Sequence, residues 1–432
     1  MRAWPTGGLW RHADFLRLWG AQTVSQFGSQ ITLLALPLAA IVTLDATPFE
    51  VALLGALEYL PFLLVTLPAG VWVDRLRRRP LLIAADFGRA LVLASVPLAW
   101  AFDALTIWQL FAVGLATGTL TVLFDVAYVP YIASLVERDE LVDANSKMEI
   151  TRSTAQAAGP GLGGALVQLL GAPLALIADA ISFAVSGLLA SRIRAAETRP
   201  SEDPAASRST RRELAEGLRY VLGHPYFRPI MATTAASNFF GSAIWGPLLL
   251  LYGVRVLDLS PATIGLTLAI GNIGVLAGAF LVRPISERLG IGRTIAGSAI
   301  LFGPVVLLIP LAPKSQPVPL IVASLAIAGF GGVVFNVTIR SLVQAITPNR
   351  LLGRTTSVIR MIVWGVIPLG TLLGGVLAST IGIRGAIWAG AIGASLAALP
   401  VLLSQVPSLT TVTALEANAE PALATGGRVE PS

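Results

Sequence analysis

The sequence predicts an all-α membrane protein with twelve transmembrane helices in two pseudo-symmetric six-helix bundles. Three observations predict this fold. Apolar stretches recur along the chain, each long enough to cross a bilayer core of roughly 30 Å at about 1.5 Å per helical residue. Basic residues gather on one side of these stretches, and short sequence patterns recur half a chain apart.

The apolar stretches define the expected spans. They cover residues 18–44, 50–72, 80–102, 106–128, 148–169, 172–192, 229–254, 262–283, 293–312, 317–339, 355–378 and 381–404. The first stretch is too long for the core of a signal peptide and lacks a convincing cleavage site. We therefore expect it to be retained as a membrane span.

Polar segments divide the chain into four expected regions. These are an N-terminal six-helix bundle (1–192), a cytoplasmic linker (193–228), a C-terminal six-helix bundle (229–404) and a disordered cytoplasmic tail (405–432). Within the linker, Leu214, Leu218 and Leu222 recur at helical spacing, which predicts an amphipathic helix on the membrane surface. The tail is polar and rich in Ala, Thr and Glu, as disordered segments are.

The distribution of the 30 Lys and Arg residues predicts the orientation. If the N-terminus is cytoplasmic, the external connections hold only Arg255, Lys314 and Arg384, so the basic residues divide 27 to 3. Basic residues in short loops stay on the cytoplasmic side. We therefore expect a multi-pass protein of the plasma (inner) membrane with both termini in the cytoplasm.

Composition excludes several classes of protein. Hydrophobic residues make up 55% of the chain and charged residues 12%, against about 25% charged in soluble domains. The basic pI of about 10.1 follows from the cytoplasmic arginines, so we expect a lipid bilayer and no nucleic acid as partner. With no cysteine and only two histidines, we expect no metal site and no cofactor.

The two halves of the chain share short patterns in the same order. Phe27-Gly28-Ser29 recurs as Phe240-Gly241-Ser242. Ser134-Leu135-Val136, followed by Arg152 and Gly163-Gly164, recurs as Ser341-Leu342-Val343, followed by Arg360 and Gly374-Gly375. Duplicated six-helix halves are a transporter architecture with the substrate near the bilayer midplane.

The loop after the second span carries a recognisable motif at Gly70, Asp74, Arg75, Arg78 and Arg79. It resembles the G-x-x-x-D-R-x-G-R-R loop of the major facilitator superfamily, which implies the major facilitator fold and a conformational-switch role for this loop. A carboxylate such as Asp74 is stabilised at the positive N-terminus of a neighbouring helix.

Two further features of the sequence bear on this resemblance. Arg77 replaces the usual second glycine of the signature, and a degraded second copy, Glu287-Arg288-Leu289-Gly290 with Arg293, follows the eighth span. The alternative is that the loop merely collects arginines that set the topology.

The fifth span contains a glycine motif at Gly159, Pro160, Gly163 and Gly164. No Lys-Ser/Thr follows it, and it lies in an apolar helix, so it is not a nucleotide-binding loop. It resembles the G-P-x-x-G-G motif of superfamily exporters, which implies proton-driven antiport. The alternative is a face of small residues that only packs helices together.

Longer segments narrow the resemblance to the enterobactin-exporter and macrolide-efflux branch. They are Glu58-Tyr59-Leu60-Pro61-Phe62, Ala85-Asp86-Phe87-Gly88-Arg89-Ala90, the run from Val129-Pro130 through Ala144-Asn145 to the glycine motif, and Glu216-Gly217-Leu218-Arg219-Tyr220-Val221-Leu222. The resemblance covers nearly the whole chain except the tail. It implies efflux of an amphipathic small molecule in exchange for protons.

Carboxylates inside the spans are the candidates for proton coupling, because an ionisable group is costly within a bilayer. Glu58 lies about eight residues into the second span, roughly 12 Å deep. Asp179 lies at a similar depth in the sixth span, whereas Asp125 is nearer the inner end of the fourth, where it could instead pair with the arginines of the loop. Asp86 and Arg89, three residues apart, are expected to form an intrahelical ion pair.

Polar and aromatic residues within the spans are candidates for lining the substrate cavity. They are Gln22, Gln26, Ser29, Asn238, Trp245, Asn272, Asn336 and Trp364. The alternatives are hydrogen bonds between helices for the polar residues and ordinary core packing for the two tryptophans.

Together these features predict a secondary active transporter that exports an amphipathic small molecule (a drug, macrolide or siderophore-like compound) by proton-coupled alternating access. An importer or proton symporter of the same fold is the main alternative. An enzyme is not expected, because no cluster of nucleophile, base and metal ligands occurs. We expect protons and a small-molecule substrate as partners, and a monomer.

Overall fold

A computed structural model shows an all-helical molecule and describes residues 8–66, 68–69, 76–137, 139–195 and 210–409. No strand occurs among these residues. The helices of the first half are α1 (Ala13–Leu38) with its π-helical end η2 (Ala39–Thr43), α2 (Pro48–Leu64), α4 (Arg78–Ala101), α5 (Ile107–Leu135), α6 (Leu141–Leu170) and α7 (Ala172–Ser191). A short turn, η1 (Gly8–Arg11), precedes them.

Most spans in the second half consist of two or more consecutive segments. They are α9 (Phe227–Trp245) and α10 (Pro247–Arg255), α11 (Pro261–Gly271) and α12 (Ile273–Leu289), and α13 (Ile291–Phe302), η4 (Pro304–Leu307) and α14 (Leu308–Leu311), followed by the unbroken α15 (Val318–Ile346) and α16 (Asn349–Thr380), and then α17 (Ile383–Leu396) and α18 (Leu399–Leu402). Glycine followed by proline marks two of the breaks, at Gly246-Pro247 and Gly303-Pro304. Proline cannot continue the hydrogen-bonding pattern of the preceding turn.

Ten helical stretches of the described residues are long and apolar enough to cross a membrane. They coincide with ten of the predicted spans. The other two predicted spans fall on α2, which is 17 residues long, and on α6, which is 30 residues long but carries its charged residues in its first half.

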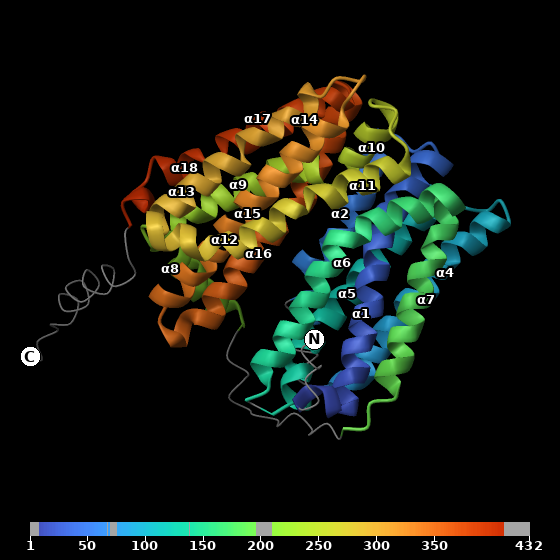
Figure 1. Cartoon of the computed structure of the whole chain (residues 1–432), viewed down its shortest axis with the longest axis horizontal. Helices are drawn as coiled ribbons and strands as arrows, with labels where there is room; N and C mark the ends of the chain where they lie inside the picture. The colour runs from blue at the N-terminus through green and yellow to red at the C-terminus, as the bar shows by residue number, and fades with distance from the viewer. Residues whose placement is uncertain (1–7, 67, 70–75, 138, 196–209, 410–432) are drawn as a thin grey trace, which may run out of the picture.

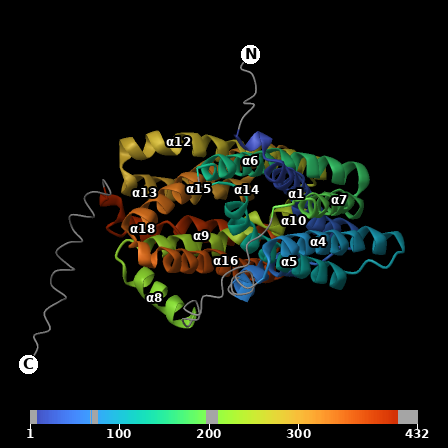
Figure 2. The same ribbon diagram turned by 90° about the horizontal axis from the view of Figure 1, so that it is seen from below.

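The helices gather in two groups. In Figure 1 the blue-to-green helices α1–α7 lie on one side and the yellow-to-red helices from α9 onward on the other, and the groups meet near α2, α10 and α11. Figure 2 shows the helices running side by side, with α8 (Thr210–Gly223) on the outer edge. We call the end of the molecule where α1 begins the near end, and the end where α2 begins the far end.

Turns at the far end repeat between the halves. Leu44-Asp45-Ala46-Thr47-Pro48 begins α2, and Leu257-Asp258-Leu259-Ser260-Pro261 begins α11. Asp45 and Asp258 both adopt positive φ (48° and 54°), and Thr47 and Ser260 each accept a hydrogen bond from the backbone N–H three residues on, as N-caps do. The two turns match in sequence, in backbone conformation and in capping, whereas the repeats described above match in sequence alone.

The three basic residues at the far end all have partners. Arg255 pairs with Asp45 at 2.6 Å and Lys314 with Asp258 at 3.5 Å. Arg384 donates to the Tyr252 hydroxyl at 3.2 Å and to the Ala312 carbonyl at 3.3 Å.

The near end differs from expectation at two points. Arg77 has φ −68° and caps α4 in an extended conformation, whereas Gly290 in the second copy has φ 80°, so the two loops turn differently. The predicted tail begins later than expected, because Val406 and Leu409 are buried and the Gly292 N–H donates to the Leu409 carbonyl at 2.9 Å.

The predicted linker helix is confirmed as α8, which packs on α16. Its Glu216 pairs with Arg354, and the Tyr220 hydroxyl donates to the Ile346 carbonyl at 3.2 Å. The segment therefore ties to the near end of the second group.

Candidate substrate path and coupling site

Glu58 lies where the two groups of helices meet. On one side of it, α5 approaches α2 closely through Gly114 and Gly118, since a Cβ at Gly114 would lie 3.3 Å from the Glu58 Cγ and one at Gly118 would overlap the Glu58 backbone. Small residues spaced four apart permit such close packing between membrane helices. Glu58 is half-buried, and its carboxylate makes no hydrogen bond or ion pair with the described residues.

An aromatic cluster continues from Glu58 across the junction. The ring of Trp364, at the middle of α16, stacks on Phe62 at 5.4 Å and on Tyr59 at 6.2 Å between centroids. Trp364 remains 37% exposed, so part of its face is open. Trp245, the other candidate tryptophan, is 44% exposed and ends α9 at the Gly246 break.

Asp179 is placed differently, inside the first group. It is fully buried, and it accepts hydrogen bonds from Thr32 of α1 at 2.5 Å and from Ser182 at 2.7 Å. Gly28 makes this possible, since a Cβ there would overlap both Asp179 and Ser182. The carboxylate therefore joins α1 to α7.

The expected Asp86–Arg89 ion pair is present in α4, at 2.5 Å, and is buried. Ser186 of α7 donates to the other carboxylate oxygen at 2.7 Å. The guanidinium lies between the rings of Phe124 and Phe183, at 4.6 and 4.1 Å. Sequence reasoning missed this sandwich, because the rings come from α5 and α7 and no local spacing connects them to Arg89.

Asp125 is exposed on α5 and makes no ion pair among the described residues. The arginines that interact with it electrostatically are Arg89, Arg152 and Arg360. These lie on α4, α6 and α16, whereas pairing of Asp125 with the arginines of the Arg75–Arg79 loop stays a prediction. Gly70, Asp74 and Arg75 of the loop lie outside the described residues.

The glycine motif of α6 contacts two different helices. Gly159 and Gly163 face α1, where a Cβ on Gly159 would overlap Gln30 and one on Gly163 would lie 3.2 Å from Ile31. Gly164 instead faces α11 in the other group, where a Cβ would lie 2.5 Å from the Pro261 carbonyl and 2.9 Å from the Gly265 Cα. Pro160 contributes its carbonyl to the same contact with Gly265.

Two of the six polar cavity candidates link neighbouring helices. The Asn272 amide donates to the Gln156 carbonyl at 2.6 Å across the two groups, and Asn238 donates to the Val363 carbonyl at 2.9 Å. Asn336 is exposed and donates to Gly332 of its own helix at 2.8 Å.

On α1, Gln22 is buried and lies 3.5 Å from Gln26, while Gln26 and Ser29 are half-buried. Gln22 therefore packs inside the first group, whereas Gln26 and Ser29 retain partly accessible faces.

The extensive contacts between the two groups lie at the far end and the middle of the molecule. Helix α2 packs on α16 and α10, α6 on α11, and α1 on α10. Within these pairs, Gly375 meets Ala52 near the far end and Gly365 meets Leu63 near the middle. The Arg255–Asp45 ion pair closes the outermost point of the junction.

Comparison with known proteins agrees with this architecture. The family model described as Major Facilitator Superfamily matches residues 18–368, with a second match over 231–426. The multidrug efflux pump Tap of Mycolicibacterium fortuitum is 26% identical over 83% of this chain and 87% of its own.

Two further proteins are similar. The uncharacterised MFS-type transporter YfiS of Bacillus subtilis is 24% identical over 85% of this chain and 87% of its own. Among solved structures, a bacterial homologue of the iron transporter ferroportin in an inward-facing state superimposes with a TM-score of 0.75 at 17% identity, covering 93% of this chain and all of the other.

Proposed function

Because this chain belongs to the major facilitator superfamily, a family of transporters and not of enzymes, we propose that it exports an amphipathic small molecule in exchange for protons. It is a multi-pass membrane protein that acts on small molecules. The proposal adds a direction, a coupling ion and a substrate class of the drug, macrolide or siderophore-like kind.

The proposed architecture is twelve spans in two pseudo-symmetric six-helix bundles, residues 1–192 and 229–404, joined by the cytoplasmic linker 193–228 and followed by a cytoplasmic tail. In this arrangement α2 and α6 are the two further spans that, with the ten apolar stretches, make twelve. The repeated Leu-Asp-x-Thr/Ser-Pro turns at Asp45 and Asp258 support it, because related turns at equivalent places are typical of duplicated halves.

The proposed orientation places the near end in the cytoplasm of a cell bounded by this inner membrane. It is supported by the 27-to-3 division of basic residues. The protein then presents a junction that is closed at its external end and held there by α2–α16, α6–α11 and the Arg255–Asp45 pair. Alternating access requires these contacts to open and contacts at the near end to form.

The observation that carries the coupling proposal is the position of Glu58. Glu58 lies on α2, the helix of the first group that packs on α16, with its side chain against Gly114 of α5 and no hydrogen-bond donor to its carboxylate among the described residues. Tyr59 and Phe62 of the same helix stack on Trp364 of α16. A carboxylate without partners in an apolar site is neutral when the site is dry and ionised when water enters. Binding of an amphipathic molecule at the rings and protonation of Glu58 would therefore exclude one another.

Efflux as the direction is supported by the relatives that are named multidrug efflux pumps. The remaining candidates for the path are Asp125, which faces Arg152 and Arg360, and Asp179. We place Asp125 on the path as an acceptor for protons or cationic groups, and Asp179 outside it.

The test is transport in a bacterial host that lacks its own drug pumps. Cells that express the protein should accumulate less of at least one amphipathic dye or antibiotic than cells carrying an empty vector. A protonophore should abolish the difference. Greater accumulation in expressing cells would instead favour an importer or symporter of the same fold, and a difference that survives the protonophore would contradict proton coupling.

A further inference from the structure

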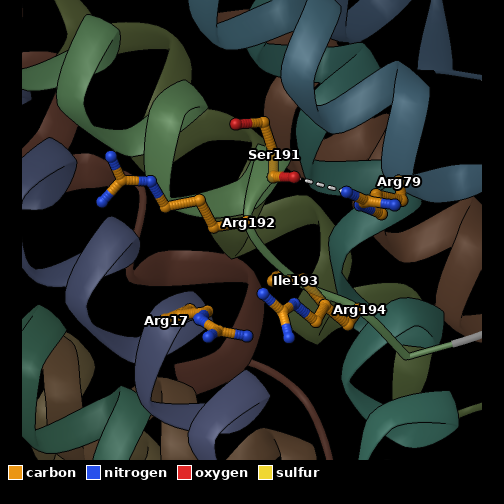
Figure 3. A pocket seen from close by; sticks show the side chains of 6 residues that line it. All are labelled: Arg17, Arg79, Ser191, Arg192, Ile193 and Arg194. Carbon is orange, nitrogen blue, oxygen red and sulfur yellow. Dashed lines mark hydrogen bonds between the residues drawn. The ribbon is translucent and has the colours of Figure 1, made fainter.

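A hollow at the near end of the first group is lined almost entirely by arginine. It has a volume of about 420 Å³ and lies among the start of α1, the start of α4 and the end of α7. Its lining residues are Arg17, Arg79, Ser191, Arg192, Ile193 and Arg194, shown in Figure 3. It lies at the opposite end of the first group from the start of α2, and of its lining residues only Arg79 belongs to the loop motif described above.

Two of the four arginines are held in place by the helices themselves. Arg79 donates from Nε to the Ala190 carbonyl at 3.3 Å and from Nη2 to the Ser191 carbonyl at 2.5 Å, so it caps the C-terminal end of α7. Arg17 pairs with Asp14 at 2.5 Å. Their guanidiniums are therefore held in place, which lowers the conformational entropy lost when a ligand binds.

The other two arginines have no such partner. The side chains of Arg192 and Arg194 are exposed and make no ion pair or hydrogen bond with the described residues. In Figure 3 the guanidinium of Arg194 is turned toward that of Arg17. Two like charges that face one another across a hollow repel each other unless an anion lies between them.

The one carboxylate that the described contacts bring to this hollow is already shared. Asp14 accepts from Arg17 and also from the backbone N–H groups of Arg194 at 3.1 Å and Ala195 at 2.8 Å. The N-termini of α1 and α4 lie beside the hollow and add positive partial charge, whereas the C-terminus of α7 adds negative partial charge that Arg79 already neutralises. Positive charge therefore exceeds negative charge on the described walls.

We propose that this hollow binds a phosphate group. The planar guanidinium donates two parallel hydrogen bonds to phosphate oxygens, and four guanidiniums from three helix ends offer more donors than a carboxylate can accept. Two sources carry this chemistry at the near end of the molecule. One is the headgroup of an anionic phospholipid in the adjacent leaflet, and the other is free phosphate.

The experiment uses the purified full-length protein and two matched variants. The pocket variant is Arg192→Gln/Arg194→Gln, and the control is Arg288→Gln/Arg293→Gln. The control removes two exposed arginines at the near end of the second group, so both variants lose the same charge on the same side of the membrane. Thermal unfolding is followed as phosphatidylglycerol, phosphatidylcholine or inorganic phosphate is added at constant ionic strength.

Phosphatidylglycerol should raise the unfolding temperature of the parent and of the control, and phosphatidylcholine should not. The pocket variant should need roughly thirtyfold more phosphatidylglycerol for the same rise, since each basic residue near an anionic surface contributes about a fivefold change in affinity. A response to inorganic phosphate with the same variant pattern would assign the hollow to free phosphate.

Retention of phosphatidylglycerol by the parent and both variants in native mass spectrometry provides a second reading that does not depend on unfolding. An equal response of the pocket and control variants, or no response of the parent to either phosphate source, would overturn the proposal.

Discussion

Two regions of this molecule hold carboxylates within the membrane, one with hydrogen-bond donors to them and one without. Inside the first group, Asp86 and Asp179 are buried and accept hydrogen bonds from Arg89, Ser186, Thr32 and Ser182. At the junction of the two groups, Glu58 is half-buried and accepts none from the described residues.

The difference teaches that depth in the membrane does not by itself identify a coupling residue. A carboxylate with two donors is held in one geometry, so it stabilises helix packing. A carboxylate without donors can change its protonation as its surroundings open and close. We therefore assign Asp86 and Asp179 to the static interior and Glu58 to the moving junction.

The largest expected effect is on stability, from breaking the buried pair of the interior. Asp86→Leu leaves the Arg89 guanidinium buried without its carboxylate and should lower the free energy of unfolding by about 3–5 kcal/mol. The double variant Asp86→Leu/Arg89→Met should recover most of this loss, because both charges are gone.

Thermal unfolding of the purified variants in detergent measures both. If the double variant is as unstable as the single one, the pair is not the reason for the loss.

The next effect is on transport, from altering the junction. Gly164→Ala places a Cβ 2.5 Å from the Pro261 carbonyl of α11 and forces the two groups apart, so transport should fall at least tenfold while the protein still inserts. Gly161→Ala is the matched control, since its Cβ would meet Ala269 at an ordinary 3.5 Å.

Efflux of a fluorescent substrate from cells with equal amounts of each variant provides the measurement. Equal loss in the two variants would mean that the close approach of Gly164 to Pro261 and Gly265 is not what transport requires.

How far the sequence could predict these regions depends on the range of the interactions. Ten of the twelve predicted spans, the linker helix and the Asp86–Arg89 pair follow from hydropathy and local spacing, and each is present. The partners of Asp179 and the two rings that enclose Arg89 could not be predicted in this way. Helices that are apolar on all faces have no periodicity to indicate which face meets which neighbour.

The turns show a signal that was available and missed. Asp45 and Asp258 occupy the same place in two Leu-Asp-x-Thr/Ser-Pro segments that are 213 residues apart, within the range of the other repeats. By contrast, the effect of Arg77 in place of the usual second glycine could not be predicted from the signature. Arg77 has φ −68°, whereas Gly290 in the second copy has φ 80°.

The smallest expected effect is at the external edge of the junction. Arg255→Gln removes the ion pair with Asp45, whose side chain is 93% exposed. Because an exposed pair contributes less than about 1 kcal/mol, the equilibrium constant for opening of the far end should rise by no more than about fivefold. The reporter is a cysteine at Ala46, which is 3% exposed in the closed junction. The native chain has no cysteine that would interfere.

The rate of labelling from outside the cell by an impermeant maleimide should rise in the Arg255 variant. A cysteine at Asp103, on the exposed turn after α4, should label at the same rate in both backgrounds. Labelling of either position only after permeabilisation would reverse the proposed orientation.

The comparison of Glu58 with Asp179 is tested most directly by efflux from proteoliposomes with and without an imposed pH gradient. Glu58→Gln imitates a permanently protonated carboxyl, so this variant should exchange substrate down its own gradient but gain nothing from the pH gradient. Asp179→Asn should lose about 1 kcal/mol of stability through its weakened hydrogen bonds and still respond to the pH gradient as the parent does. A Glu58→Gln variant that the gradient accelerates as much as the parent would contradict the account.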